Sequence, residues 1–381
     1  MKMIFLGDIC PDNNYRSLFD ENAIGAFNAE AVAFFKTHDF VLANLECPAT
    51  LSLRAITKTG PNIGARPNDI KILKNCGINN LSIANNHILD FGDEGVVETI
   101  EVCNKEGMNL VGGGLNKKDA SEPLIAEYGG LKVGILAFAE EEFNLVTNER
   151  PGALHFDPYE SLEAIANLKK AVNRVIIIYH GGIEYYKYPS PELQKKCRAM
   201  IRAGADLILC QHSHCIGTVE QYRERSIVYG QGNTCFGWRK SSETWNEGLA
   251  VEYQPEDNSI NFRLLEATKS GVELVDSCKS DLRVKEIIKD SEHCYNSEFL
   301  KAEWIAFCRS MRSLNLPLLY GKSKFYNRLN RLVGNRLIDC CYGNTAKMIT
   351  LELIRCEAHL EVMKTILEDE IQFYTSCRKF R

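Results

Sequence analysis

Polar side chains that can bind metal follow the ends of five short apolar runs in this 381-residue chain. They are Asp8, Glu46, Asn86, His87, His180, His212 and His214. Carboxylates, an amide oxygen and neutral imidazoles suit divalent ions of intermediate hardness, such as Mn, Fe and Zn. Two such ions, roughly 3.5–4 Å apart, would use six or seven protein groups. The residue types therefore predict a centre of two divalent metal ions.

Each of these residues alone also has an ordinary structural explanation. Asp8 follows a glycine and could cap a turn, Asn86 could occupy a left-handed turn, and His180 precedes two glycines. His212 and His214 are a stronger signal, because residues two apart in an extended segment face the same way. The repetition at five strand ends, in a chain with eight histidines, favours one common site.

Alternating strands and helices are predicted to position these residues. The strands of the five runs are expected at 3–6, 40–43, 81–84, 174–179 and 206–210. Helices with apolar residues at helical spacing are expected at 26–37, 70–76, 94–106, 158–172 and 191–203. This alternation indicates a layered α/β domain over residues 1–268, in which ligands gather outside the carboxyl ends of the strands.

The pattern becomes helical almost throughout over residues 279–381. Amphipathic segments are predicted at 324–337 and 345–374. We interpret them as helices that pack against the first domain or against another subunit, which would make a homo-oligomer. A basic helix on a membrane surface at 324–337 is the weaker alternative.

Composition limits the classes of partner and the cellular location. Lys and Arg total 45 and Asp and Glu total 50, so the net charge of −5 gives no reason to expect nucleic acid as a partner. Fifteen cysteines with no Cys-x-x-Cys spacing favour reduced thiols in a cytosol. With no apolar run of about 18 residues and no signal-peptide pattern at the amino terminus, a cytoplasmic protein without a transmembrane segment is predicted.

The motifs in their order resemble the bacterial capsule-synthesis CapA family, which is associated with poly-gamma-glutamate and is a branch of the calcineurin-like metallophosphoesterases. The resemblance covers roughly residues 1–250. It is carried by Gly7-Asp8, Asn44-Leu45-Glu46, Ala84–His87 with Asp90-Phe91-Gly92, His180–Tyr185, Gln211–His214 and Gly230–Asn233. The fold that this resemblance implies is a four-layer α/β/β/α metallophosphoesterase-like sandwich, here followed by an extra C-terminal helical region.

The resemblance also implies how the ligands are divided between the two ions. Asp8 and His214 would hold one ion, Asn86, His180 and His212 would hold the other, and Glu46 would lie at or near the bridge. One departure is Cys10, which stands where the wider superfamily has the histidine of Asp-x-His. Cys10 is either a softer ligand or a buried bystander.

The implied activity is metal-dependent hydrolysis of a phosphoester or of an acyl or amide bond. By the resemblance, His87 is the catalytic imidazole that binds no metal, and Asp90 is expected to orient it. From their positions, Lys58, Arg66 and Glu184 are predicted to bind charged parts of an anionic small-molecule or polymer substrate. Two alternatives stay open: a noncatalytic partner in envelope polymer assembly, and a nucleotide phosphoesterase.

Overall fold

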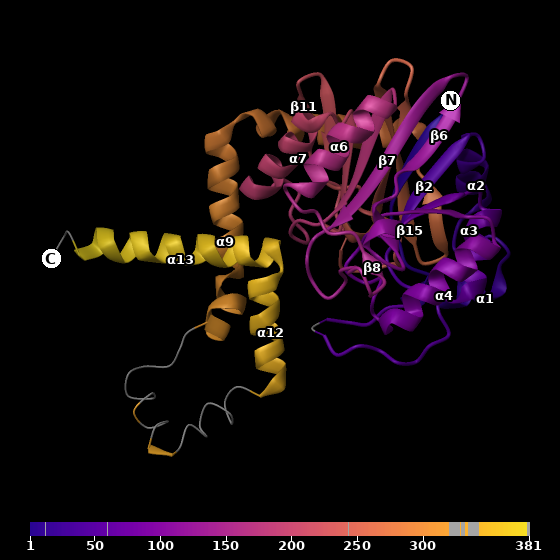
Figure 1. Cartoon of the computed structure of the whole chain (residues 1–381). Helices are drawn as coiled ribbons and strands as arrows, with labels where there is room; N and C mark the ends of the chain where they lie inside the picture. The colour runs from indigo at the N-terminus through magenta and orange to yellow at the C-terminus, as the bar shows by residue number, and fades with distance from the viewer. Residues whose placement is uncertain are drawn as a thin grey trace. The chain divides into compact units, whose positions relative to one another are not determined.

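The computed structural model describes residues 1–11, 13–58, 60–242, 244–319, 328, 332–333 and 343–378 (Figure 1). The chain forms two compact units. One comprises Met1–Ile56 and Asn62–Leu300, and the other comprises Thr57–Pro61 and Lys301–Arg381. The domain boundaries at 268 and 279 stay a prediction.

The larger sheet of the first unit is built around four parallel strands. Its order is β16-β15-β14-β1-β2-β3-β4, with β13 also paired to β1. β1 to β4 run parallel, as do β1 and β13, whereas β14, β15 and β16 are antiparallel. The strands are β1 (Met3–Ile9), β2 (Phe40–Leu45), β3 (Asn80–Ser82), β4 (Asn109–Val111), β13 (Asn233–Cys235), β14 (Glu247–Gln254), β15 (Ser259–Thr268) and β16 (Gly271–Leu274).

The smaller sheet also has a parallel centre, with an antiparallel strand at each edge. Its order is β11-β12-β10-β9-β7-β6. The strands are β6 (Leu124–Tyr128), β7 (Leu131–Ala139), β9 (Arg174–His180), β10 (Leu207–Gln211), β11 (Val219–Tyr222) and β12 (Arg225–Val228). A separate two-stranded ribbon pairs β5 (Gly113–Gly114) with β8 (Gly152–Ala153).

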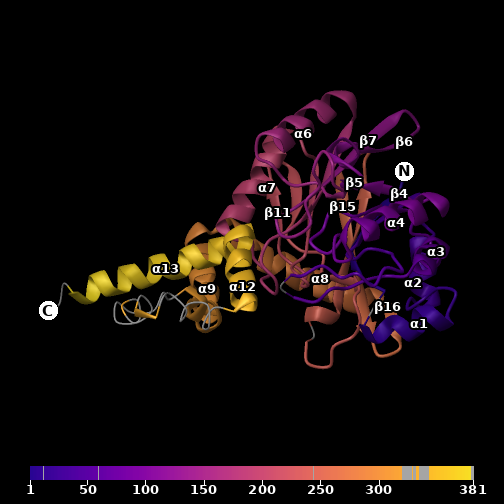
Figure 2. The ribbon, with the colours of Figure 1, turned by 60° about the horizontal axis from the view of Figure 1, so that its bottom comes forward.

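Helices cover the outer faces of the two sheets (Figures 1 and 2). α6 (Glu160–Ala171) and α7 (Pro191–Ala203) pack on the smaller sheet, at β7, β9 and β10. The larger sheet is covered by α2 (Ala29–Phe35), α3 (Pro67–Asn75), α4 (Gly92–Lys105) and α8 (Ser277–Ser291). Shorter elements are α1 (Arg16–Glu21), α5 (Lys117–Ser121) and the 3-10 turns Asn13–Tyr15, Thr244–Asn246 and Glu292–Tyr295.

The alternation of side chains along β9 shows that two sheets pack face to face. Ile176 and Ile178 belong to the same buried cluster as the core of the larger sheet. Ile177 and Tyr179, on the opposite face, cluster with α6 and α7. The layers are therefore helix, sheet, sheet and helix, which confirms the predicted four-layer α/β/β/α sandwich.

Local signals in the sequence begin and end these elements near the predicted positions. At the start of α7, the Ser190 side chain accepts a hydrogen bond from the Leu193 amide and Pro191 occupies the first helical turn. The helix ends at Gly204, whose φ of +123° favours glycine. The predicted helix 191–203 is therefore confirmed at both ends.

The second unit contains most of α9 (Ser297–Leu319), together with α12 (Asn344–Arg355) and α13 (Glu357–Arg378). The prediction of one continuous helix over 345–374 is wrong, because Cys356 has a non-helical ψ of 118° that separates α12 from α13. Ile354 of α12 is 59% exposed, whereas Val362 of α13 is buried. Most of the predicted helix at 324–337 lies outside the described residues.

Contacts between α9 and α13 hold the second unit together. The indole nitrogen of Trp304 donates to the Thr365 hydroxyl at 3.0 Å, and Arg309 forms an ion pair with Asp369 at 2.6 Å. Within the described parts of the chain, none of the helices combines the length and apolar character needed to cross a bilayer.

Replacing Gly7 by alanine should destabilise the sandwich. A Cβ atom at Gly7 would lie 2.3 Å from the Gly232 carbonyl oxygen, and backbone of β1 and the 230–232 turn would have to separate. We expect a loss of about 1–3 kcal/mol in the free energy of unfolding, measured by urea denaturation. Gly343→Ala is the control, because a Cβ there meets no atom of the described residues within 4 Å. Equal stability of Gly7→Ala and the unmodified chain would contradict the close approach.

Candidate metal centre

The carboxyl ends of five parallel strands bring the predicted ligands into one buried cluster. β1, β2 and β3 of the larger sheet and β9 and β10 of the smaller sheet end on the same side of the sandwich, and strand register aligns Asp8 with Asn44 and His180 with Gln211. The ligands are all 9% exposed or less. They are Asp8, Glu46, Asn86, His180, His212 and His214. The structure thus brings together residues that span two hundred positions of the sequence.

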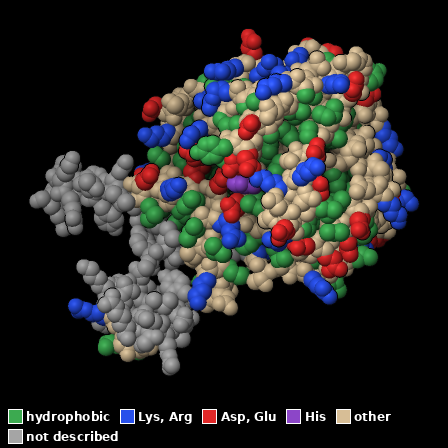
Figure 3. Space-filling model, in the orientation of Figure 1, with side chains coloured by type: hydrophobic (Ala, Val, Ile, Leu, Met, Phe, Trp, Pro, Cys, Tyr) green, Lys and Arg blue, Asp and Glu red, His purple; other side chains and the backbone are tan. Residues whose placement is uncertain are grey.

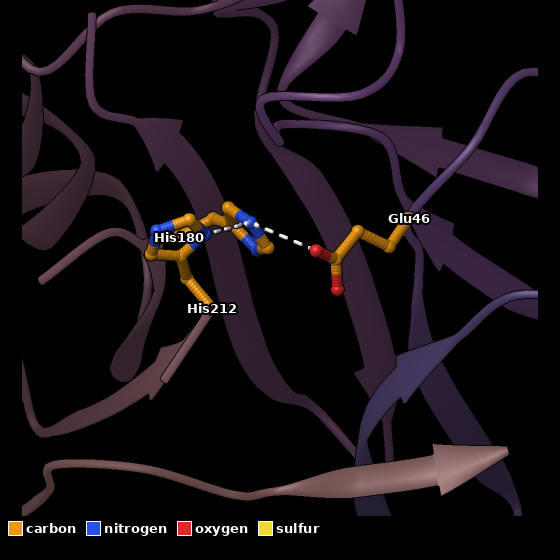
Figure 4. A group of neighbouring side chains, drawn as sticks. All are labelled: Glu46, His180 and His212. Carbon is orange, nitrogen blue, oxygen red and sulfur yellow. Dashed lines mark hydrogen bonds and ion pairs between the residues drawn. The ribbon is translucent and has the colours of Figure 1, made fainter. Parts of the chain in front are cut away.

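One group of ligand atoms surrounds His180. Its Nε2 atom lies 3.0 Å from Asn86 Oδ1, 3.2 Å from His212 Nδ1 and 3.6 Å from Glu46 Oε1. Glu46, His180 and His212 point toward one another from both sheets (Figure 4). One ligand atom from each of these three lies within 4.8 Å of the others, so a single ion could contact all of them.

A second group lies around His214. Its Nε2 atom is 3.7 Å from Glu46 Oε1, and its Nδ1 atom is 3.8 Å from Asp8 Oδ2. Asp8, Glu46 and His214 again each offer an atom within 4.8 Å of the others. Glu46 belongs to both groups, which is the position that a bridging carboxylate would occupy.

Glu46 itself is electrostatically unfavourable without a cation. Its side chain is fully buried, and neither carboxylate oxygen has a hydrogen-bond partner among the described residues. Burial, followed by the negative charge of Asp8, raises the pKa of Glu46 well above its usual value. A buried carboxylate is stable in the charged form only when it is paired or coordinates a metal. The residues present therefore fit a pair of divalent ions.

Burial also favours the neutral, metal-binding form of two histidines. Burial lowers the pKa of His180, helped by the neighbouring imidazoles, and it lowers the pKa of His214 despite the charges of Asp8 and Glu184. His212 differs: burial acts to lower its pKa, but the charges of Glu142, Glu184, Glu140 and Asp8 together raise it. On the face drawn in Figure 3, both acidic and basic side chains adjoin the histidine that is visible there.

Buried amides hold the ligands in place. Asn44 donates to Asp8 Oδ1 at 2.8 Å and lies 3.2 Å from His180 Nδ1. Asn85 donates to Asn44 Oδ1 at 3.1 Å, and Asn233 Oδ1 lies 2.9 Å from His214 Nδ1. Because Asn233 presents its carbonyl oxygen, His214 Nδ1 donates and Nε2 is left to face Glu46. Asn233 lies in the Gly230–Asn233 motif but is not among the ligands predicted from the sequence.

The backbone around the cluster adopts unusual conformations. Tyr185, His212 and His214 have φ values of 60°, 84° and 50°. Among the described residues, the other non-glycine positions with positive φ lie in the hairpin turns at 223–224 and 258. Outside such turns, each conformation of this kind costs on the order of 1–3 kcal/mol and persists only where surrounding structure enforces it. The strain is concentrated where side chains must converge.

His87 and Asp90 form a pair beside the ligand cluster. His87 Nδ1 lies 2.7 Å from Asp90 Oδ2, and the same oxygen accepts a hydrogen bond from the Ile63 amide at 2.8 Å. A carboxylate accepts, so Nδ1 of His87 donates and Nε2 is the atom that can exchange a proton with a ligand. The geometry supports the predicted orientation of His87 by Asp90.

The three predicted substrate-binding residues occupy different environments. Glu184 is half-buried, and its charge raises the pKa of both His212 and Glu46. Arg66 is exposed and forms an ion pair with Asp20 at 2.5 Å. Lys58 belongs to Thr57–Pro61, which groups with the second compact unit. Their roles in substrate binding stay predictions.

Glu142 is a candidate functional residue that the sequence reasoning missed. Its Oε2 atom accepts a hydrogen bond from the side-chain Nδ2 atom of Asn86 at 3.3 Å, and its Oε1 atom lies 3.9 Å from His212 Nε2. The sequence contains a signal for it, because the acidic run 140–142 directly follows the apolar run 131–139, just as the predicted ligands follow other apolar runs. Cys10 is buried but is absent from the ligand groups around Glu46 found among the described residues.

This combination defines a class: a four-layer α/β/β/α protein with a buried carboxylate and histidine cluster at the carboxyl ends of its strands. The chain belongs to the family of the bacterial capsule synthesis protein PGA_cap, whose model matches residues 2–237. The resemblance to the CapA family is thereby confirmed.

Two curated relatives carry capsule or PGA names. The chain is 28% identical to the capsule biosynthesis protein CapA of Bacillus anthracis over 269 residues, which is 68% of this chain and 64% of that protein. It therefore spans slightly less than two thirds of that relative. Identity to the PGA biosynthesis protein CapA of Bacillus subtilis (strain 168) is 27% over 307 residues, 77% of this chain and 79% of that protein.

Two solved structures from Thermus thermophilus also align with the chain. A hypothetical protein gives a TM-score of 0.45 at 15% identity, covering 70% of this chain and 99% of that chain. A 5'-nucleotidase precursor gives a TM-score of 0.41 at 14% identity, covering 75% of this chain and 57% of that chain.

Glu46→Gln should stabilise the metal-free protein at neutral pH. Unfolded Glu46 releases its proton near its usual value of 4.5, whereas the raised pKa keeps the proton on the folded chain. Glu46 therefore reduces stability increasingly as pH rises above about 4.5 toward its raised folded-state pKa. Melting temperatures in a strong chelator should be higher for Glu46→Gln at pH 7, and the difference should shrink at pH 4. A lower melting temperature for the variant at pH 7 would contradict the electrostatic account.

Proposed function

We propose that this chain is a metal-dependent hydrolase with a dinuclear centre of Mn, Fe or Zn. Asp8 and His214 would hold one ion, and Asn86, His180 and His212 would hold the other. The observation that carries the proposal is Glu46, whose buried oxygens lack hydrogen-bond partners among the described residues and belong to both groups of ligand atoms. Two cations would convert an unfavourable buried carboxylate into a bridging ligand.

The proposed reaction is hydrolysis of a phosphoester or of an acyl or amide bond. When bound, the two ions would stabilise developing negative charge and make water more acidic. The protonated imidazole of His87 would donate its Nε2 proton to the leaving group, while Asp90 accepts the hydrogen bond from Nδ1 and stabilises the positive charge. The backbone amide of Ile63 fixes the Asp90 carboxylate from the other side.

The proposed substrate is an anionic molecule that belongs to the synthesis of a capsule polymer. The relatives named for capsule and PGA biosynthesis support this context, with poly-gamma-glutamate as the candidate polymer. Cations attract anionic substrates, and the net charge of −5 offers no general surface for nucleic acid. A cytoplasmic location and self-association through the C-terminal helices belong to the proposal.

A noncatalytic role in envelope polymer assembly is the second candidate. Cys10 favours it, because it replaces a histidine of the superfamily pattern and is absent from the ligand groups found around Glu46 in the described residues. A nucleotide phosphoesterase would use the same ligands on a different substrate. Turnover across phosphoesters, nucleotides and γ-glutamyl peptides, with Mn present, distinguishes the three candidates.

Metal analysis tests the dinuclear centre directly. Purified full-length chain loaded with Mn should contain about two ions per chain by elemental analysis. His214→Ala should retain about one, whereas Glu46→Gln should weaken both sites because both groups lose a ligand. His38→Ala is the control, because His38 pairs with Glu252 instead. A Glu46→Gln variant that binds as much metal as the unmodified chain would contradict the assignment of Glu46 as a bridging ligand.

Substitution of His87 tests the proposed proton donor. His87→Ala should keep both metal ions and lose on the order of 10²- to 10⁴-fold in turnover, because it removes the proton donor and no ligand. Asp90→Asn should lose less turnover than His87→Ala, because it keeps the imidazole in place and replaces only the carboxylate that stabilises the imidazolium. Unchanged turnover in His87→Ala, with metal retained, would refute this assignment.

A further inference from the structure

Arg239 is an exposed side chain that the fold holds firmly in one place. Its guanidinium carbon lies 3.1 Å from the ring centre of Trp245, and Nη1 donates to the Tyr185 hydroxyl at 3.4 Å. The Arg239 amide donates to Asn246 Oδ1 at 2.9 Å, and its carbonyl accepts from Asn246 Nδ2 at 2.8 Å. The backbone hydrogen bonds to Asn246 and the stacking of the guanidinium on Trp245 fix both ends of Arg239.

The aromatic residues under Arg239 connect it to a proposed metal ligand. Trp245 is buried, and its ring centre lies 4.8 Å from that of His214. Tyr185 is half exposed, with its ring centre 6.3 Å from His214 and 6.4 Å from Trp245. Arg239 therefore lies at the outer end of an aromatic cluster that begins at the candidate metal centre.

The charge of Arg239 has no carboxylate partner among the residues that the structure describes. Arg16, Arg198 and Arg283, by contrast, each form a close ion pair with a carboxylate. A guanidinium carries five N–H donors in a planar arrangement that matches the oxygens of carboxylate or phosphate groups. Nη1 bonds the Tyr185 hydroxyl, which leaves N–H groups for a ligand.

We infer that Arg239, Tyr185 and Trp245 form a binding subsite for an oxyanion group of the substrate, a carboxylate or a phosphate, next to the bond that reacts. The inference rests on the proposed function, because the reacting group would lie at the ligand cluster. Arg239 would form two parallel hydrogen bonds to the oxyanion, Tyr185 would fix the guanidinium from the side, and Trp245 would hold it flat. The subsite would select substrates that carry a second anionic group beside the bond that reacts.

Direct binding measurements test the subsite without requiring turnover. The full-length chain loaded with Mn is titrated calorimetrically with γ-linked tetraglutamate, which carries only carboxylates, and with adenosine 5'-monophosphate, which carries a phosphate. Arg239→Met preserves apolar cover of Trp245 and removes the charge. Arg202→Met is the matched control, because Arg202 is also exposed and donates to a tyrosine hydroxyl, Tyr222, at 3.3 Å.

Arg239→Met should weaken binding on the order of tenfold, as expected for loss of charge-assisted hydrogen bonds, while Arg202→Met binds normally. If only tetraglutamate loses affinity for Arg239→Met, the group bound at the subsite is a carboxylate. If only the nucleotide loses affinity, the group bound is a phosphate. Equal affinities of Arg239→Met and the unmodified chain, equal losses in both variants, or no binding of either probe overturn the inference. Absence of metal or of hydrolysis, with the Arg239 effect intact, would count against the proposed function alone.

Discussion

A fully buried carboxylate without hydrogen-bond partners among the described residues is the constraint around which this structure is arranged. Glu46 lies between two groups of metal-ligand atoms, and burial together with Asp8 raises its pKa. Folding around such a group is unfavourable for an isolated chain, because the charge loses its hydration. Two divalent cations at this position would make the contribution of Glu46 to the free energy of folding favourable. Stability and the proposed metal binding would therefore be coupled through one side chain.

The scaffold meets the constraint by dividing the ligands between two sheets. In the larger sheet, Asp8 lies near the end of β1, and Glu46 and Asn86 follow β2 and β3. In the smaller sheet, His180 is the last residue of β9 and His212 follows β10. Their placement depends on face-to-face packing of β-sheets through a shared apolar core. Hydrogen bonds of buried side-chain amides, and backbone with positive φ values, then fix the final positions of these side chains. A small rotation between the sheets would separate the two halves of the site.

The residues outside the ligand cluster give the site its chemical character. His87 forms a close pair with Asp90 and is the proposed group for proton transfer, while Glu142 and Glu184 place negative charge near His212. Arg239 supplies positive charge on the aromatic cluster beside His214. The match to the family model covers residues 2–237, so Arg239 and Trp245 lie just beyond it.

The sequence by itself determined the strands, their polar ends and the ligand types, because strand periodicity and capping depend on neighbouring residues. The strand expected at 174–179 and the helix expected at 191–203 correspond closely to β9 and α7. Only the tertiary structure decided that Glu46 is shared between two groups, that Glu142 and Asn233 join the site, and that the helix breaks at Cys356. These features depend on distances between residues far apart in the chain. Such distances are set by the packing of the sheets and helices, which no local pattern contains.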